Sequence, residues 1–79
     1  MTKKVVVYSS NFCPWCDKVK EFLKENNVEF EERNVQENQE YAKEMQEKTG
    51  QLGVPVIDVD GKIIIGFNVP ALKEALGLK

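Results

Sequence analysis

Two cysteines stand where an apolar, strand-like run meets a helix-like segment, and no other feature constrains the fold of this chain as much. The run Val5–Tyr8 is β-branched and aromatic without polar alternation, which predicts a strand covered on both faces. The polar residues 9–11 end it. Cys13 and Cys16 are the only two cysteines in the sequence. Pro14 between them suits the first position of a helix, so both sulfurs are expected near a first helical turn.

That position favours redox chemistry at the cysteine pair. The unpaired N–H groups and the dipole at a helix start favour negative charge, and such sites can lower a cysteine pKa from ~8.5 into the range of roughly 3.5–7.5. Cys13, where the chain enters the helix, is predicted to be the exposed attacking thiolate. Cys16, about one turn in and partly shielded, is predicted to resolve the mixed disulfide. The chain contains no histidine, and this chemistry needs no general base.

Bulk properties indicate one small soluble domain, residues 1–79. The net charge of −2 gives no reason to expect nucleic-acid or anionic-membrane binding. No run approaches the ~20 apolar residues of a membrane span. The opening Met1–Val7 turns from basic to apolar but is too short for a signal peptide. We therefore expect a cytoplasmic protein, and in that compartment a lone cysteine pair is more often catalytic than structural.

The first half of the chain reads as strand, helix, strand and helix. The first helix is predicted from Pro14 to about Asn26, closed by the Asn26–Asn27 pair. In residues 28–35, the apolar Val28, Phe30 and Val35 are interspersed with Glu29, Glu31 and Glu32, which predicts a strand with one solvent-exposed face near a sheet edge. Asn38 is a plausible N-cap of the second helix, and Gly50 is its expected end.

The second half predicts a hairpin and a short helix. Asp60-Gly61 joins the runs Val54–Val59 and Lys62–Ile65, a strong signal for a two-residue turn. Asn68 is expected to cap a last helix that ends at Gly77. The order is β-α-β-α-β-β-α, an α/β chain whose first two strands should be parallel through a right-handed crossover and whose last two should be antiparallel. Helical spacing assigns to the core Val19, Phe22, Leu23, Tyr41, Met45, Leu72 and Leu76.

Joined to this order, Cys13-Pro14-Trp15-Cys16 resembles the Cys-Pro-Tyr-Cys site of the glutaredoxins. Tyr8-Ser9 before the site and Thr49-Gly50-Gln51 followed by Val54-Pro55 also match the family pattern, so the resemblance covers essentially the whole chain. It implies a thioredoxin-like fold with a four-stranded mixed sheet and three helices. It also implies a dithiol–disulfide oxidoreductase with glutathione as co-substrate, which reduces protein or glutathione-mixed disulfides. Pro55 would be cis and face Cys13, and the backbone of Val54 would be free to pair with an extended substrate.

Several residues depart from the glutathione-binding members of that family. Ser10 stands where many have lysine, Gly53 where many have threonine, and Gly66-Phe67-Asn68 where many have Gly-Gly and acidic or hydroxyl residues. Gly66-Phe67 is closer to the redoxins that serve ribonucleotide reductase and are recharged by thioredoxin reductase. The electron donor therefore stays open, with glutathione favoured slightly. The residues expected to contact glutathione are Pro14, Trp15, Gln51, Val54, Pro55, Phe67 and Asn68.

Other interpretations of the same residues remain. Trp15 and, more weakly, Phe12 shape the rim of the site, or are ordinary half-buried aromatics. Pro55 could start an edge strand, Gly66–Asn68 could be only a strand end and helix cap, and Gln51 a surface residue. We expect no metal, because zinc needs about four ligands and the sequence offers two thiols and no histidine. We also expect a monomer. A dimer could nevertheless pool four cysteines around zinc or an iron–sulfur cluster. A purely structural disulfide is least favoured, since so short a loop constrains the unfolded chain little.

Overall fold

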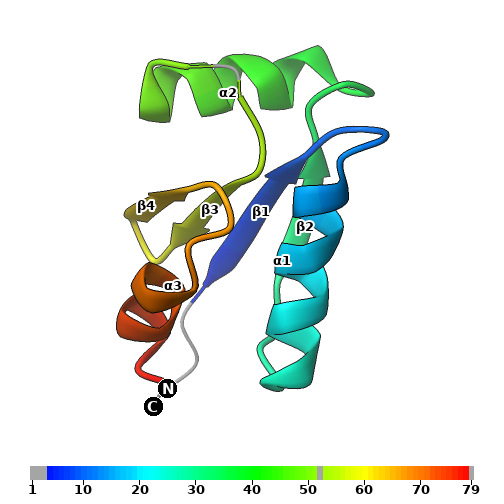
Figure 1. Ribbon diagram of the computed structural model, residues 1–79. Helices are drawn as coiled ribbons and strands as arrows, with labels where there is room; N and C mark the ends of the chain where they lie inside the picture. Colours follow the sequence, from blue (N-terminus) through cyan, green and yellow to red (C-terminus); the bar gives the residue numbers. More distant parts are fainter. Residues whose placement is uncertain (1–3, 52, 79) are drawn as a thin grey trace.

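The computed structural model describes residues 4–51 and 53–78, and residues 1–3 of the opening stretch lie outside it (Figure 1). The order along the chain is strand, helix, strand, helix, two strands and helix, as predicted. Their bounds are β1 Val5–Ser9, α1 Pro14–Glu25, β2 Glu31–Asn34, α2 Gln39–Thr49, β3 Val56–Val59, β4 Lys62–Ile65 and α3 Val69–Leu76. No helix in these two stretches is long and apolar enough to cross a membrane.

The strands form one mixed sheet in the order β2-β1-β3-β4. β1 and β2 are parallel and β3 and β4 are antiparallel, which confirms the two predicted directions. β1 and β3 are also antiparallel. In the register, Tyr8 pairs with Val56 and Val56 with Ile65. The end of β1, the start of β3 and the end of β4 therefore meet at one edge of the sheet. The segments beyond this edge hold both cysteines, Pro55 and Phe67.

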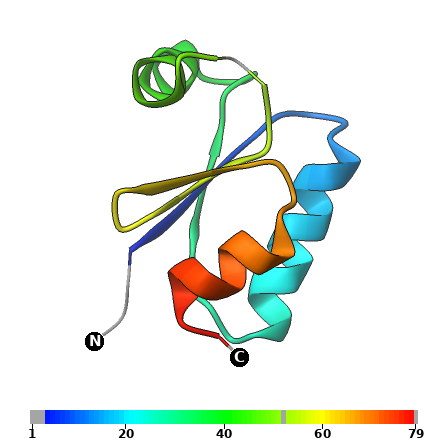
Figure 2. The ribbon, with the colours of Figure 1, turned by 60° about the vertical axis from the view of Figure 1, so that its left-hand side comes forward.

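Helices cover both faces of the sheet. α1 and α3 lie on one face and α2 lies on the other, so the sheet is the middle of three layers (Figure 2). Side chains of a strand point alternately to its two faces. Val5 and Val7 accordingly pack with Leu23 of α1 and Leu72 of α3, whereas Val6 and Tyr8 pack with Met45 of α2. Val5–Tyr8 are buried, as their uninterrupted apolar pattern predicts. Ser9, which was expected to end the strand, is its last residue and is buried too.

Local capping explains where the helices begin and end. The side chains of Asn38 and Asn68 accept hydrogen bonds from backbone N–H groups at the starts of α2 and α3. Gly50 and Gly77 follow these helices in the left-handed conformation, with φ of 75° and 72°. α1 ends one residue before Asn26, and Asn27 takes the left-handed conformation with φ 57°. The predicted ends of the three helices are thus confirmed.

The second strand is shorter than its sequence pattern predicts. The pattern covers residues 28–35, but β2 spans only Glu31–Asn34. Val28 and Phe30 precede it and pack against the core below α1 and α3, while Val35 follows it and packs on the α2 side. Its place at the edge of the sheet is confirmed. β2 is polar throughout, as an edge strand can be, and the apolar residues of the predicted strand lie before and after β2.

Two further expectations need correction. β3 begins at Val56, so Val54 and Pro55 belong to the preceding loop. Tyr41 is only half-buried, and the guanidinium of Arg33 lies 5.5 Å from its ring centroid. The helical spacing placed Tyr41 on the apolar face, but the polar edge strand β2 offers it a cation in place of an apolar neighbour.

Candidate active site

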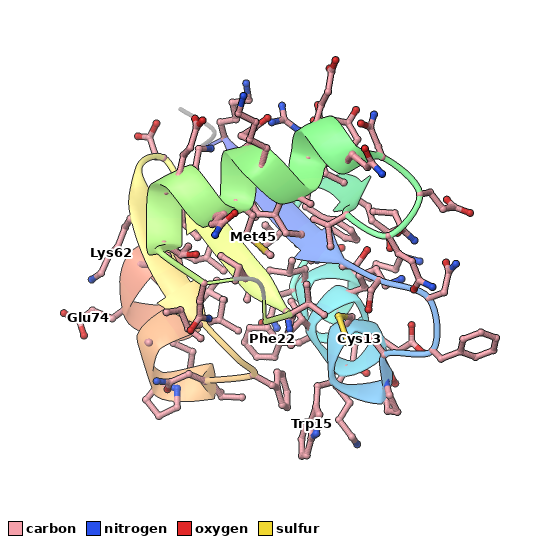
Figure 3. The ribbon with its side chains drawn as sticks, turned by 90° about the horizontal axis from the view of Figure 1, so that it is seen from above. Cys13, Trp15, Phe22, Met45, Lys62 and Glu74 are labelled. Carbon is pink, nitrogen blue, oxygen red and sulfur yellow. A yellow bond between two sulfur atoms is a disulfide. The ribbon has the colours of Figure 1, made fainter. Side chains whose placement is uncertain are left out.

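The two cysteines are joined at the start of α1. Cys13 is the N-cap residue of the helix and Cys16 lies in its first turn. Their sulfurs form a disulfide, with the Cα atoms 5.2 Å apart (Figure 3). The backbone N–H of Cys16 donates a hydrogen bond to Sγ of Cys13 over 3.1 Å. Cys13 is half-exposed, whereas Cys16 is only 1% exposed. The two cysteines therefore differ in solvent exposure, and the sulfur of the more exposed one, Cys13, accepts a hydrogen bond from a helix N–H.

A loop with a cis peptide bond lies at the same edge of the sheet. The Val54–Pro55 bond is cis, so Pro55 does not simply begin an edge strand. Pro55 is buried, and its carbonyl oxygen accepts a hydrogen bond of 2.9 Å from the N–H of Gly66. This bond ties the loop to the segment between β4 and α3. Val54 is half-buried and makes no backbone hydrogen bond to any described residue.

An aromatic cluster borders the disulfide. The indole of Trp15 lies 6.3 Å from the ring of Phe67, which in turn meets the ring of Phe22 edge-on at 6.2 Å. Phe22 is half-buried, whereas Trp15 is 58% exposed and projects away from the body of the molecule (Figure 3). The ammonium of Lys18 lies 5.9 Å from the centroid of the indole. Phe67 thus links Trp15 to the core below α1, while the indole stays largely exposed to solvent.

The remaining predicted site residues have identifiable local roles. Pro14 occupies the first position of α1 and is exposed. Asn68 uses its side-chain oxygen to accept the N–H of Ala71 and so cap α3. Gln51 lies in the loop before Pro55, where its backbone N–H and carbonyl oxygen both bond the hydroxyl of Thr49. Gln51 makes no hydrogen bond to α1 within the described part of the chain.

A polar tether holds the loop before Cys13, and the sequence analysis did not identify it. The side chain of Asn34 donates to the side-chain oxygen of Asn11 over 3.0 Å, and the N–H of Asn11 donates to the side-chain oxygen of Gln36 over 3.0 Å. The oxygen of Asn34 also accepts the backbone N–H groups of Gln36 and Glu37. The two bonds that Asn34 accepts from backbone N–H groups form a turn that is typical of Asn at the end of a strand. An Asn at this position is the sequence signal from which the turn could have been predicted.

A second polar group connects β1, β2 and α1 beneath the site. Glu32 accepts hydrogen bonds from the ammonium of Lys20 over 2.7 Å and from the hydroxyl of buried Ser9 over 2.8 Å. These bonds lower the pKa of Glu32, and the bond to Glu32 raises that of Lys20. Asp17, next to Cys16, also pairs with Lys20 over 3.4 Å. This group fixes the first half of α1 relative to the edge strand.

On the opposite face of the sheet, a charge cluster surrounds the buried hydroxyl of Tyr8. The hydroxyl donates to Glu44 over 2.5 Å and accepts from Lys48 over 2.9 Å. Lys48 also pairs with Asp58, and Arg33 with Glu44. Burial and the bond to Glu44 raise the pKa of Tyr8, while the bond from Tyr8 lowers that of Glu44. The cluster joins α2 to β1 and β3, so we assign it to holding α2 on the sheet.

The described residues contain no group of three or more His, Cys, Asp or Glu side chains placed to hold a metal ion. The site that the structure assembles is instead the cysteine pair, the cis-proline loop and the aromatic cluster, all at one sheet edge. Of the residues that the sequence analysis associated with glutathione, Trp15, Pro14, Val54, Pro55 and Phe67 come from these three segments. This arrangement suits thiol–disulfide exchange.

Comparison with known proteins identifies the family. Residues 5–64 match the glutaredoxin family model. The chain is 47% identical over 64 residues to a glutaredoxin-like protein of Clostridium pasteurianum, which covers 81% of this chain and 85% of that protein. It is 38% identical over 70 residues to the glutaredoxin-like protein NrdH of Lactococcus lactis, covering 89% and 96% of the two chains. The crystal structure of a glutaredoxin from Archaeoglobus fulgidus superposes with a TM-score of 0.83 and 29% identity, over 92% of this chain and 85% of that one. With its Cys13–Cys16 pair, the chain therefore belongs to the glutaredoxin family and is a small thiol–disulfide oxidoreductase.

Proposed function

We propose that the chain reduces disulfides by successive attack of its two thiols, Cys13 first and Cys16 second. The observation that carries this assignment is the contrast between a half-exposed Cys13, whose sulfur accepts the N–H of Cys16, and a Cys16 that is 1% exposed. An incoming disulfide meets the accessible sulfur first. A hydrogen bond from a helix N–H to that sulfur stabilises its anion, which is the nucleophilic form.

The reaction balances as two exchange steps. The Cys13 thiolate attacks one sulfur of the substrate disulfide, the substrate S–S bond breaks, and the other substrate sulfur leaves as a thiolate. Cys16 then loses its proton and attacks Sγ of Cys13. The Cys13–Cys16 bond forms and the second substrate sulfur leaves. Two electrons pass from the dithiol to the substrate, and solvent supplies and accepts the protons. The closed disulfide of the structure corresponds to the product of this sequence.

Glutathione is the reductant that we propose for reopening the disulfide. Two glutathione thiols would restore the dithiol and leave as one glutathione disulfide. The exposed indole of Trp15, the ring of Phe67 and the unbonded backbone of Val54 would contact a tripeptide bound beside Cys13. Pro14, Pro55, Gln51 and Asn68 would line its edges. Lys18, close to the indole, can attract a glutathione carboxylate.

Thioredoxin reductase is the second candidate, and the start of α3 favours it. Carboxylates commonly bind the free N–H groups at a helix N-terminus. Here the N–H of Asn68 donates to Gly66, the N–H of Ala71 donates to Asn68, and Pro70 has none. Few donors remain for a glutathione carboxylate, so its affinity should be modest. A protein electron donor that recognises the surface around the disulfide would not need these N–H groups. Ribonucleotide reductase would then be a protein substrate.

The test compares the two reductants on the oxidised protein. One arm contains glutathione, and the other contains NADPH with thioredoxin reductase. The appearance of free thiols is followed in both. We expect reduction in the glutathione arm at millimolar concentrations. Reduction in the reductase arm alone would overturn glutathione as the donor and support the second candidate. In a separate assay with a disulfide substrate, turnover by a Cys13→Ser variant with either reductant would contradict the thiol assignment itself.

We further propose that the protein works as a cytoplasmic monomer with residues 1–79 as one domain and no permanent cofactor. The alternative is a dimer that holds zinc or an iron–sulfur cluster between Cys13 residues. Anaerobic purification followed by visible spectroscopy, metal analysis and sedimentation separates them. A colourless, metal-free, active monomer is the expected result, and a coloured or zinc-containing dimer would contradict it.

A further inference from the structure

Phe12, the residue directly before Cys13, has a conformation and an environment that the fold does not require. Its side chain is 99% exposed, the highest value among the exposed large hydrophobic residues of the described chain. Its backbone has φ 57°, in the left-handed region that bulky side chains disfavour. A glycine or asparagine would adopt this backbone more readily and would expose no aromatic surface. Neither packing nor local conformation therefore explains a phenylalanine here.

The backbone that carries this ring is tethered. Asn11, the preceding residue, bonds both Asn34 and Gln36. Cys13, the following residue, caps α1, and its carbonyl oxygen accepts the N–H of Asp17 over 3.2 Å. The chain is thus held on both sides of Phe12. A ring presented on a fixed backbone loses little backbone freedom when it binds a partner, which favours its use as an anchor.

Phe12 and Trp15 enclose Cys13 and Pro14 in the sequence, and both aromatic rings are exposed. Lys18 lies beside the indole and forms no ion pair with any residue that the structure describes. The residues that flank the accessible Cys13 therefore include two exposed aromatic side chains, and a cation without an ion pair in the described chain lies beside one of them. A small disulfide can reach Sγ of Cys13 without contacting the ring of Phe12 or of Trp15. An extended peptide that crosses the sulfur can contact both rings.

We propose that Phe12 is a specificity residue that binds an apolar side chain next to the target cysteine of a protein substrate. The occupant is an extended peptide segment that carries the disulfide, an apolar residue against Phe12 and an acidic residue near Lys18. This surface is continuous with the site of thiol exchange, so the inference rests on the proposed function. It makes disulfides within proteins, rather than small free disulfides, the preferred substrates.

The experiment compares Phe12→Asn with the native protein on two substrates, insulin and bis(2-hydroxyethyl) disulfide. Asparagine accepts the left-handed backbone and removes only the ring. We expect kcat/KM for insulin to fall by about tenfold, mainly through KM, while that for the small disulfide stays within about twofold. The unfolding temperature should be unchanged or raised. Ile65→Thr, which removes another exposed apolar side chain, is the matched control and should change neither rate.

Each other outcome contradicts the inference. An equal fall with both substrates would mean that Phe12 supports Cys13 itself, and no fall with insulin would mean that the ring binds no protein chain. Loss of a dimer in sedimentation of Phe12→Asn would identify a second copy of this chain as the occupant. If the native protein reduces neither substrate, the proposed function fails instead. If it reduces both and Phe12→Asn is indistinguishable from it, only the present inference fails.

Discussion

The backbone N–H of Cys16 donates its hydrogen bond to the sulfur of Cys13, at 3.1 Å, at the N-cap position where proteins usually place an oxygen. The helix cap and the accessible sulfur of the cysteine pair are therefore the same atom. A hydrogen bond to a charged acceptor is stronger than one to a neutral acceptor, so a Cys13 thiolate should cap α1 better than a Cys13 thiol. Helix formation and ionisation then favour each other at this site.

Replacement of each cysteine by serine should give different products. Cys13→Ser keeps an N-cap side chain for α1, so we expect a folded protein with activity at background. Cys16→Ser keeps the attacking sulfur, so it should accumulate as a mixed disulfide with one substrate sulfur. Mass spectrometry of the quenched reaction measures both. Mixed disulfide on Cys16 in the Cys13→Ser variant would reverse the assignment.

Asn34→Ala should weaken the loop that presents Cys13. The variant loses the bond to Asn11 and the two backbone bonds that Asn34 accepts, which we expect to lower the free energy of unfolding by about 1–2 kcal/mol. Amide exchange of residues 10–12 should accelerate, and turnover should fall.

Asn38→Ala is its control. This variant loses the cap of α2, with a similar cost of about 1 kcal/mol, but it leaves the loop before Cys13 intact. Urea denaturation and hydrogen exchange on both variants make the comparison. Equal exchange rates at residues 10–12 in the two would show that Asn34 has no special effect on the loop.

Stability should decrease in acid partly through Glu44. Its hydrogen bond from Tyr8 and the charges of Arg33 and Lys48 hold its pKa below the ordinary value of 4.5. A carboxyl with a lowered pKa contributes stability that is present above 4.5 and lost as the pH falls through the folded-state pKa. The urea midpoint of Glu44→Gln should therefore fall less steeply below pH 4.5 than that of the native protein. Tyr8→Phe, which removes the hydroxyl but keeps the carboxylate, should fall less steeply too. Parallel curves for all three proteins would contradict this account.

The two faces of the sheet should contribute independently to stability. Met45 and Leu72 are both 0% exposed, and they lie in separate clusters on opposite faces. Each replacement by alanine should cost about 2–5 kcal/mol. Because a small domain has only about 5–15 kcal/mol in total, we expect the double variant to be largely unfolded at 25 °C. Circular dichroism in urea measures the single and double variants. A double variant as stable as either single one would show that the clusters are not separate.

The sequence predicts those elements that residues close in the chain determine. Asn38 and Asn68 signal their helices through contacts two or three residues away. Asp60 and Gly61 both have positive φ, 53° and 97°, as a two-residue hairpin turn requires. Cys13 and Cys16 were found for the same reason, because their three-residue spacing already fixes both at one helix start.

Features that depend on register or on distant partners could not be predicted in this way. Tyr8 meets Glu44 and Lys48, which lie 36 and 40 residues away in the sequence, only after α2 docks on the sheet. β2 was predicted too long because alternation alone does not show which residues pair with β1. The tether between Asn11 and Asn34 spans 23 residues and needs the parallel pairing of β1 and β2. The left-handed backbone of Phe12 has no sequence signal, since the residue type argues against it.

The most direct test of the account is the pH dependence of alkylation of Cys13. The reduced Cys16→Ser variant carries a single thiol, and its second-order rate with iodoacetamide is measured from pH 4 to 10, folded and in urea. We expect the folded protein to reach half of its maximal rate at least about one pH unit below the urea-unfolded chain, because the helix start stabilises the thiolate. Coincident curves would show that the folded site gives Cys13 no advantage over a free thiol and would contradict the account.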